Sequence, residues 1–205
     1  MKVVIIGSGN VATHFALAFF EADVEVSQIW SNNYDNAIQL ANKVNADAIE
    51  DLSNIDNNAD LCLVAVKDDA ISEIGKKLNN FKGIVVHTAG SVSLQVFEHL
   101  DNYGVLYPLQ TFSKNKSLSF KNIPLCVEAN NNESLKAIKN IASKLSKHVE
   151  EVSSDKRKVL HLSAVFACNF TNHLYALAAD LLVENDLNFD LLRPLITETA
   201  HKILT

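Results

Sequence analysis

Two hydrophobic periods alternate along the first three quarters of the chain. Short continuous apolar runs, typical of strands covered on both faces, are followed by segments whose apolar residues recur every three or four positions, as in helices. The predicted strands are residues 3–6, 24–30, 46–49, 61–66, 83–87, 103–107, 123–128 and 149–152. The predicted helices are residues 11–22, 34–44, 94–100 and 132–147, with another that ends at Leu78 and is capped by Asp68 or Asp69. This alternation predicts an α/β fold with a doubly wound parallel sheet.

The pattern changes near Ser153. From there to Asn185 the helical period is unbroken for about 30 residues, or ~45 Å of helix. A second helical pattern follows over residues 189–204, with Pro194 at its start or at a kink. We therefore predict a sheet domain over residues 1–152 and a small all-α domain over residues 153–205. Two helices do not close a core alone, so we expect a homodimer formed through them.

A glycine turn joins the first predicted strand to the first helix. The strand at residues 3–6 leads into Gly7, Ser8, Gly9, Asn10 and Val11, and Ala12 takes the third small position. Gly7 permits the tight turn, and Gly9 lets a pyrophosphate approach the backbone at the positive end of the helix. This context predicts a Rossmann-type dinucleotide site, whereas the plainer interpretation is a strand-to-helix turn without a ligand.

The residues after the second strand bear on the choice of coenzyme. A carboxylate there would bind the ribose of NAD and repel a 2′-phosphate, but this chain has Ser31 and Asn32. We therefore predict NADP, with NAD as the alternative. No Arg or Lys is close in the sequence, and Lys43 is a full helix away. A purely structural interpretation makes Ser31 and Asn32 caps of the next helix.

Other polar groups follow later strands or interrupt the long helix. Carboxyl ends of parallel strands meet at one edge of the sheet, so Ala65, Val66 and Lys67 are expected along the cofactor. His87, Thr88 and Ser91 are expected near its nicotinamide end, although Ser91 also fits a helix cap, and the loop at residues 109–113 is a predicted substrate wall. On the long helix, His161 and Asn169 share one broad face. They are candidates for the cleft, and the alternative is an interhelical hydrogen bond at a dimer interface.

Composition excludes several classes of partner. The chain has 205 residues and a net charge of −6, which argues against nucleic acid or an anionic membrane as partner. Cys62, Cys126 and Cys168 are widely spaced in apolar runs, so we expect reduced, buried cysteines in a cytoplasmic protein and no metal site. No apolar run reaches the roughly 18 residues of a membrane span, and Met1 and Lys2 lead directly into a strand without a signal peptide.

Several blocks together resemble one bacterial family. These are Rossmann-like proteins fused to the domain of unknown function 2520 and labelled as NADP oxidoreductases of the deazaflavin-dependent type. The resemblance rests on residues 7–12, 64–71, 87–91, 106–112, 161–164 and 169–173. The family is similar to pyrroline-5-carboxylate reductases and to the 6-phosphogluconate and 3-hydroxyacid dehydrogenases.

That kinship implies a Rossmann domain, a helical dimerisation domain and a substrate cleft between them. The Lys and Asn pair of the hydroxyacid dehydrogenases does not carry over, because Lys158 and Asn169 are not one turn apart. The resemblance also implies a longer second domain, so a chain that stops at Thr205 is expected to be a shortened or truncated member.

We predict an oxidoreductase that transfers a hydride between NADP and a small carbonyl, imine or hydroxy compound. His161, with His87 or Ser91, is the expected proton donor, and Asn169 is a further candidate for the catalytic site. A non-catalytic dinucleotide sensor is the alternative. A methyltransferase that uses S-adenosylmethionine is a weaker third interpretation, because the second strand lacks the acidic residue that it requires.

Overall fold

The computed structural model describes residues 1–113 and 116–203 of the chain. Its sheet has the strand order β3-β2-β1-β4-β5-β6-β7-β8. In chain order the strands are β1 Lys2–Ile6, β2 Glu25–Trp30, β3 Asp47–Ile49, β4 Leu61–Val64, β5 Ile84–His87, β6 Tyr103–Pro108, β7 Leu125–Ala129 and β8 Val149–Glu151. β1 to β6 are parallel in the Rossmann order, which confirms the predicted fold class.

The far edge of the sheet differs from the prediction of a wholly parallel sheet. β7 pairs antiparallel to β6, and β8 pairs parallel to β7, so the last two strands run against the others. The segment between β6 and β7 contains no α-helix among its described residues, only the 3₁₀ turn η4 at Phe120–Asn122. A parallel return requires a long crossover, usually a helix, and a short return leaves the next strand antiparallel.

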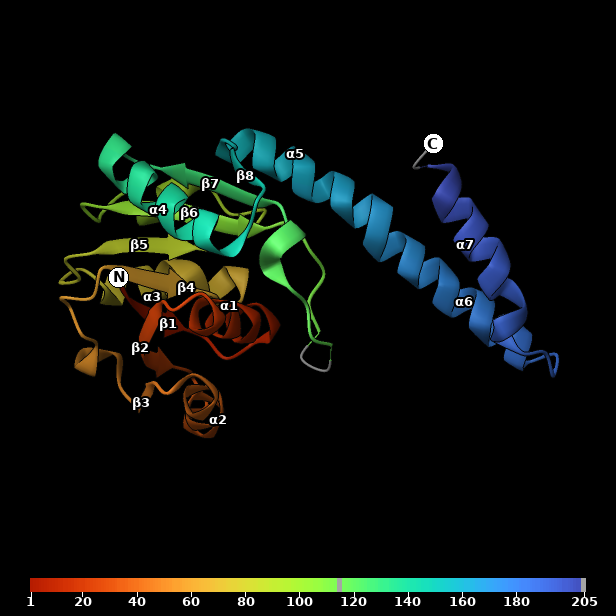
Figure 1. Ribbon diagram of the computed structural model, residues 1–205, viewed down its shortest axis with the longest axis horizontal. Coiled ribbons are helices and arrows are strands. Elements are labelled where there is room, and N and C mark those ends of the chain that lie inside the picture. The colour runs from red at the N-terminus through yellow and green to blue at the C-terminus, as the bar shows by residue number, and fades with distance from the viewer. Residues whose placement is uncertain (114–115, 204–205) are drawn as a thin grey trace. The chain divides into compact units, whose positions relative to one another are not determined.

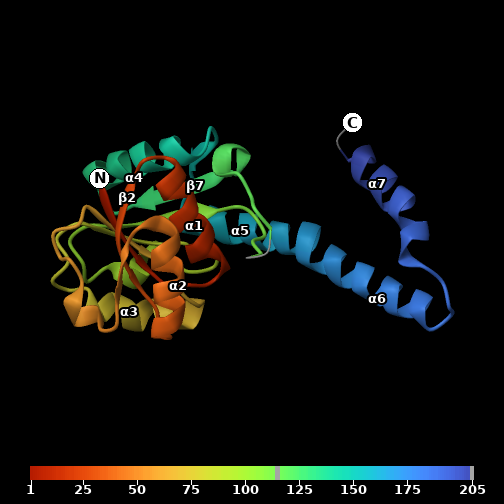
Figure 2. The same ribbon diagram turned by 60° about the horizontal axis from the view of Figure 1, so that its bottom comes forward.

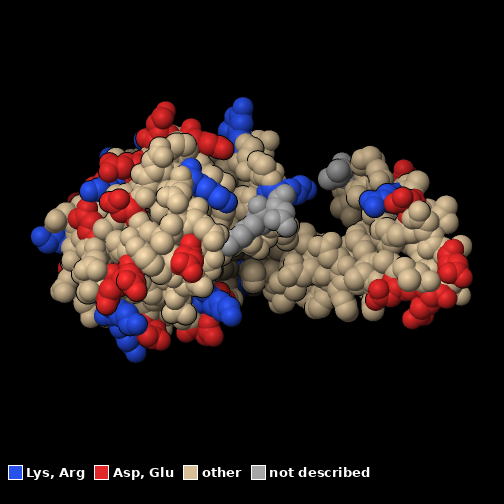
Figure 3. All heavy atoms as spheres, turned by 90° about the horizontal axis from the view of Figure 1, so that it is seen from below, with Lys and Arg blue, Asp and Glu red and all other residues tan. Residues whose placement is uncertain are grey.

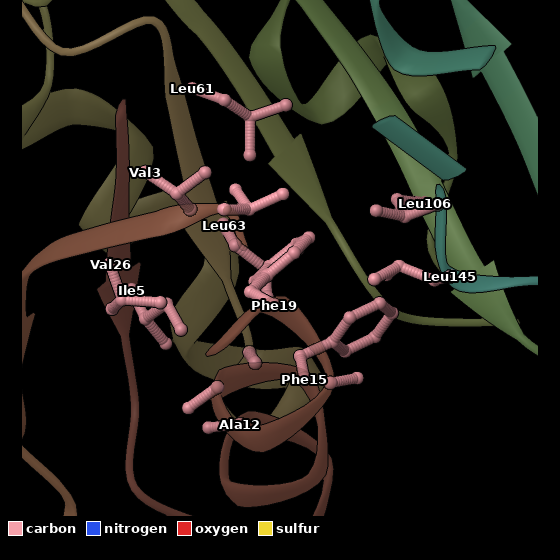
Figure 4. Close-up of a cluster of buried hydrophobic side chains, with 14 of the residues drawn as sticks. Val3, Ile5, Ala12, Phe15, Phe19, Val26, Leu61, Leu63, Leu106 and Leu145 are labelled. Atoms are coloured by element: carbon pink, nitrogen blue, oxygen red, sulfur yellow. The ribbon is translucent and has the colours of Figure 1, made fainter. Parts of the chain in front are cut away.

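Helices cover both faces of the sheet (Figures 1 and 2). α1 (Asn10–Glu21), α2 (Tyr34–Val44) and α4 (Asn132–Leu145) pack on one face, whereas α3 (Ile71–Lys77) and the 3₁₀ turn η3 (Leu94–Phe97) pack on the other. Figure 4 shows Phe19 of α1 close to Leu63 of β4, and Phe15 of α1 directed toward the side of the cluster where Leu106 of β6 lies. All four side chains are fully buried, so this contact fixes α1, and the turn before it, against the sheet.

Several local predictions need correction. The helix expected at residues 94–100 is the single turn η3. Neither aspartate caps the helix that ends near Leu78: Lys67 holds the N-cap position of the 3₁₀ turn η2 (Asp68–Ala70), and no side chain caps it. Cys62 and Cys126 are buried as expected, but Cys168 is exposed, as are Phe166 and Phe170 in the same apolar run.

The long C-terminal helix is not a regular α-helix throughout. It consists of α5 (Ser154–Ala164), a π-helical turn η5 (Val165–Phe170) and α6 (Thr171–Val183). The 3₁₀ turn η6 (Phe189–Leu192) and α7 (Arg193–Lys202) follow, with Pro194 in the first turn of α7. The chain forms two compact units, Met1–His161 and Leu162–Thr205. No helix in the described ranges combines the length and hydropathy needed to cross a membrane.

A buried ion pair anchors the start of α5 within the first unit. The guanidinium of Arg157 is fully buried and donates through Nη1 to the Glu128 carboxylate at 2.6 Å and through Nη2 to the Val92 carbonyl at 2.6 Å. Ser154 donates from its backbone N–H and its hydroxyl to the same carboxylate, at 2.9 and 2.7 Å. Because these bonds join β7, the loop after β5 and α5, they set where α5 begins.

His87 is another large polar side chain in the core. It has no exposed surface, its Nδ1 accepts the Ala89 N–H at 3.2 Å, and its ring meets Phe97 edge-on at 5.7 Å. Burial, with a smaller contribution from the charge of Arg157, lowers the pKa of His87 to about 3. His87 is therefore neutral in the folded protein at physiological pH.

This burial predicts acid sensitivity of the fold. The folded pKa lies below the unfolded value of about 6.5, so the contribution of His87 to stability is complete above that value and is lost as the pH falls toward 3. Between pH 7 and pH 5 the loss is about 2 kcal/mol. In urea unfolding, the free energy of unfolding of the His87→Gln variant should fall by about 2 kcal/mol less than that of the wild type between pH 7 and pH 5. His99→Gln, at an exposed position, is the control; an identical pH dependence in both variants would contradict the assignment.

Candidate functional site

Gly7 holds the turn after β1 in a conformation that only glycine adopts easily. Its φ is +124°, and a Cβ added there would lie 2.2 Å from the carbonyl oxygen of Ala65. Its N–H donates to the Trp30 carbonyl at 2.7 Å. The turn is therefore pressed between the ends of β2 and β4, and any larger residue would force these strands apart.

Gly9 differs, because nothing in the fold requires a glycine there. A Cβ at Gly9 would meet no atom within 4 Å, and its φ of −72° suits any residue. Gly9 is the N-cap of α1, which has no side-chain cap and no acidic residue in its first turn. The first N–H groups of α1 and its partial positive charge are thus left for an anion.

A cavity of about 720 Å³ opens beside this turn. The structure brings together around it every residue that the sequence assigned to cofactor binding. Those residues are Gly7, Ser8, Gly9, Asn10, Val11, Ser31, Asn32, Ala65, Val66, Lys67 and Thr88. They come from the carboxyl ends of four neighbouring strands, and the volume lies within the range of small-molecule and cofactor sites.

One end of the cavity lies at the end of β2. There the hydroxyls of Ser8 and Ser31 lie 2.7 Å apart. The cap of α2 is Asn33, whose side chain accepts the Asn36 N–H at 3.1 Å, so the interpretation of Ser31 and Asn32 as the helix caps is wrong. Asn32 is exposed, whereas Ser31 is buried and its hydroxyl also accepts the Asn33 N–H at 3.4 Å.

Lys77 is a lining residue that the sequence analysis missed. Lys77 lines the cavity from α3, although it lies far from Ser31 and Asn32 in the sequence. Trp30, at the end of β2, also lines the cavity. The Nζ of Lys77 lies 3.0 Å from a Glu73 carboxylate oxygen, and both of these side chains are more than half exposed. Lys77 therefore joins Lys67, which the sequence already assigned to the cofactor, as a second cationic residue in the cavity lining.

The other end of the cavity reaches Thr88 and Ala89 after β5. Ser91, two residues further on, is exposed, and its hydroxyl donates to the carboxylate of Asp68, another lining residue. The cap of η3 is Ser93, which excludes the interpretation of Ser91 as that cap. His87 does not join this group, because its side chain is fully buried against Phe97 on the α3 face of the sheet.

His161 lies beside the same end of the cavity. Its Nδ1 is 2.9 Å from the hydroxyl of Tyr107 at the end of β6, and the two rings meet edge-on at 5.8 Å. A Cβ on Gly90, next to Ala89, would lie 2.6 Å from the same Nδ1. Burial raises the pKa of Tyr107 to about 12, so its hydroxyl keeps its proton. No pattern in the sequence predicts this pairing, because Tyr107 has the pattern of an ordinary strand residue.

Asn169 and the loop after β6 are two further segments that the sequence analysis assigned to the site. Asn169 is exposed in the π-helical turn and belongs to the second unit. The loop after β6, a predicted substrate wall, is tied to the start of α1. Asn10 donates from Nδ2 to the Phe112 carbonyl at 2.9 Å, and Nε2 of His14 lies 2.9 Å from the Ser113 carbonyl.

Two family models match consecutive parts of the chain. Residues 2–89 match the family described as NADP oxidoreductase coenzyme F420-dependent, and residues 123–205 match domain of unknown function DUF2520. The pyrroline-5-carboxylate reductase of Aquifex aeolicus is 30% identical over 100 residues, which is 49% of this chain and 38% of that reductase. The chain thus spans well under half of that curated relative.

Among solved structures, a protein of Bacteroides fragilis described as a putative NADP oxidoreductase is 45% identical. The match covers 98% of this chain and 80% of that one, with a TM-score of 0.93. The reductive aminase of Aspergillus terreus, solved with NADPH, shares only the fold, at 11% identity and a TM-score of 0.77 over 99% of this chain and 73% of that one. The chain belongs to the family in which an NADP oxidoreductase domain precedes DUF2520.

Proposed function

We propose that this protein is an NADP-dependent oxidoreductase that transfers a hydride between the nicotinamide and a small carbonyl, imine or hydroxy compound. The observation that carries this proposal is Gly9, a glycine without a structural need at the open N-terminus of α1, in the wall of a cavity of about 720 Å³. A ligand that must approach the backbone accounts for such a glycine.

The proposed cofactor contacts follow the cavity from one end to the other. The pyrophosphate would accept from the backbone N–H groups after Gly9, while Ser31 and Asn32 would bind the adenosine ribose and its phosphate. Val66 and Thr88 would flank the nicotinamide half. In this proposal residues 1–152 form the dinucleotide-binding domain, and residues 153–205 form a substrate and dimerisation domain.

When bound, the nicotinamide supplies or accepts the hydride. The chain must then orient the substrate and place a donor at the oxygen or nitrogen that gains an electron pair. We assign this role to His161, beside Gly90, with Ser91 as a further polar contact. The burial of His87 makes it a structural residue in this scheme.

The Gly9→Ala variant tests the proposed cofactor site. Alanine fits the backbone at Gly9, so the melting temperature should stay the same or rise slightly, while the added methyl group should weaken NADPH binding by about tenfold or more. Trp30, the single tryptophan, lines the cavity and reports binding by its fluorescence. Wild-type protein whose fluorescence responds to neither NADPH nor NADH would refute the site.

Turnover separates an enzyme from a sensor. Wild-type protein with NADPH should oxidise the coenzyme in the presence of a member of a panel of small carbonyl compounds and cyclic imines, with Δ1-pyrroline-5-carboxylate included because of the similarity to its reductase. The Gly9→Ala variant should lose this oxidation at subsaturating NADPH. Binding without oxidation by any panel member would count against the enzymatic proposal.

Lys77 is expected to favour NADP over NAD. Its ammonium lines the cavity that Ser31 and Asn32 share, so Lys77→Gln should weaken the binding of 2′,5′-ADP by about fourfold and leave 5′-AMP unaffected. Lys76→Gln makes the same charge change at an exposed neighbour outside the cavity lining and serves as the control. Equal losses for both ligands, or for both variants, would argue against this role.

We also propose a homodimer formed through the C-terminal helices, in the cytoplasm. Residues 162–179 contain no Asp, Glu, Lys or Arg, and Figure 3 shows the second unit as a largely uncharged stretch with acidic groups toward one end. An apolar stripe follows α5 and α6, each member about half exposed or more: Leu162, Phe166, Phe170, Leu174, Leu177 and Leu181. Such a stripe is typical of an interface. The cysteines of the described chain form no disulfide, which suits a reducing compartment.

Sedimentation equilibrium tests the dimer. The wild-type chain should sediment as a dimer, whereas Phe166→Asp and Leu174→Asp should each give monomers, because a buried charge on the stripe has no partner. Asn172→Asp adds the same charge to the opposite face of α6 and should leave the dimer intact. A monomeric wild-type protein at micromolar concentration would contradict the proposal.

A further inference from the structure

Three elements hold the imidazole of His161 in one place. Tyr107 of β6 contacts its Nδ1 at 2.9 Å, and the backbone of Gly90 lies against the same edge of the ring, where an added methyl group would come within 2.6 Å. One helical turn earlier, Arg157 fastens α5 to the sheet through the buried pair with Glu128. The position of the ring is therefore fixed by contacts from the sheet, from a turn and from its own helix.

The hydroxyl of Tyr107 determines which ring nitrogen carries the proton. Tyr107 is only 8% exposed, and within residues 1–113 and 116–203 its hydroxyl has a single hydrogen-bond partner, Nδ1 of His161. The raised pKa keeps the phenol protonated. A buried hydroxyl donates to the acceptor it has, so the neutral imidazole accepts at Nδ1 and carries its proton on Nε2.

The exposed side of the ring is the one that matters for a substrate. Nε2 lies across the imidazole from the Tyr107 and Gly90 contacts, and in the described chain no hydrogen bond engages it. The ring adjoins Gly90, and the two residues before Gly90 line the cavity. A fixed N–H donor is thus left unused beside the end of the cavity where Thr88 and Ala89 lie.

We propose that Tyr107 is a positioning residue that fixes His161 as an Nε2–H donor to the substrate. This inference rests on the proposed oxidoreductase function. When the hydride reaches the carbonyl or imine carbon, the electron pair of the double bond moves to oxygen or nitrogen, and the Nε2–H bond to that atom strengthens as its charge grows. Water then supplies the proton that completes the product, and the imidazole stays neutral throughout.

The absence of a side chain at Gly90 leaves room for the imidazole ring of His161. Its backbone conformation does not demand glycine, but a side chain there would collide with the ring of His161 rather than with backbone. Gly90→Ala should therefore displace the imidazole from Tyr107 without disturbing the sheet, and it offers a second way to break the pair.

Nitrogen NMR of ¹⁵N-histidine-labelled protein tests the proton position directly. The His161→Gln variant identifies the His161 signals among those of the seven histidines. At a pH where the ring is neutral, wild-type protein should show His161 as the Nε2–H tautomer. Tyr107→Phe, which keeps the aromatic contact and removes the hydroxyl, should show both tautomers in exchange, and Gly90→Ala should do the same. An unchanged tautomer in Tyr107→Phe, or an Nδ1–H form in the wild type, would overturn the inference.

Kinetics separates positioning from a merely structural role. With the panel compound that wild-type protein reduces best, Tyr107→Phe should lower kcat by about tenfold and leave the KM for NADPH unchanged. An unchanged kcat would overturn the inference even if the tautomer shifts.

Separate results would disprove the oxidoreductase function and the positioning role of Tyr107. If wild-type protein binds no nicotinamide coenzyme, the proposed function falls, and this inference falls with it. If NADPH binds and is oxidised but Tyr107→Phe behaves as wild type in both measurements, only the role of Tyr107 is lost.

Discussion

The contact between Gly7 and the end of β4 is the constraint on which the cofactor cavity depends. A positive φ at Gly7 lets the chain leave β1 and enter α1 after three residues, and the missing side chain lets the turn touch the carbonyl of Ala65. α1 is then held by Phe15 and Phe19 in the core, so its N-terminus opens beside the sheet edge. The uncapped N–H groups and the cavity both follow from this geometry.

The second constraint is the buried pair of Arg157 and Glu128. Removing two charges from water is costly, and a buried ion pair is weak evidence for stability. Here its bonds converge on one place, joining β7, the loop after β5 and the first turn of α5. They determine where the helix starts, and therefore where His161, one turn after Arg157, meets Tyr107. We therefore interpret the main role of the pair as positioning α5, and not as stabilising the fold.

The cavity also shows how an acidic protein accommodates an anionic ligand. The net charge is −6, and the cavity lining includes Asp68 and Glu73, yet the same lining offers the backbone amides at the start of α1, hydroxyl groups and the ammonium groups of Lys67 and Lys77. Such groups act over a few ångströms and are little affected by distant carboxylates, which salt screens. Overall charge therefore predicts the class of macromolecular partner but says little about a small ligand in a shaped site.

The sequence by itself determined the alternation of strands and helices, the glycine turn and the lining residues that follow the strand ends, because these depend on local periodicity and on the rule that carboxyl ends of parallel strands share an edge. Only the tertiary structure decided the reversal of β7, the burial of His87, the approach of Lys77 and the pairing of Tyr107 with His161. Each of these joins residues distant in the chain, and hydrophobic periodicity records which face of an element is buried but not what it meets there.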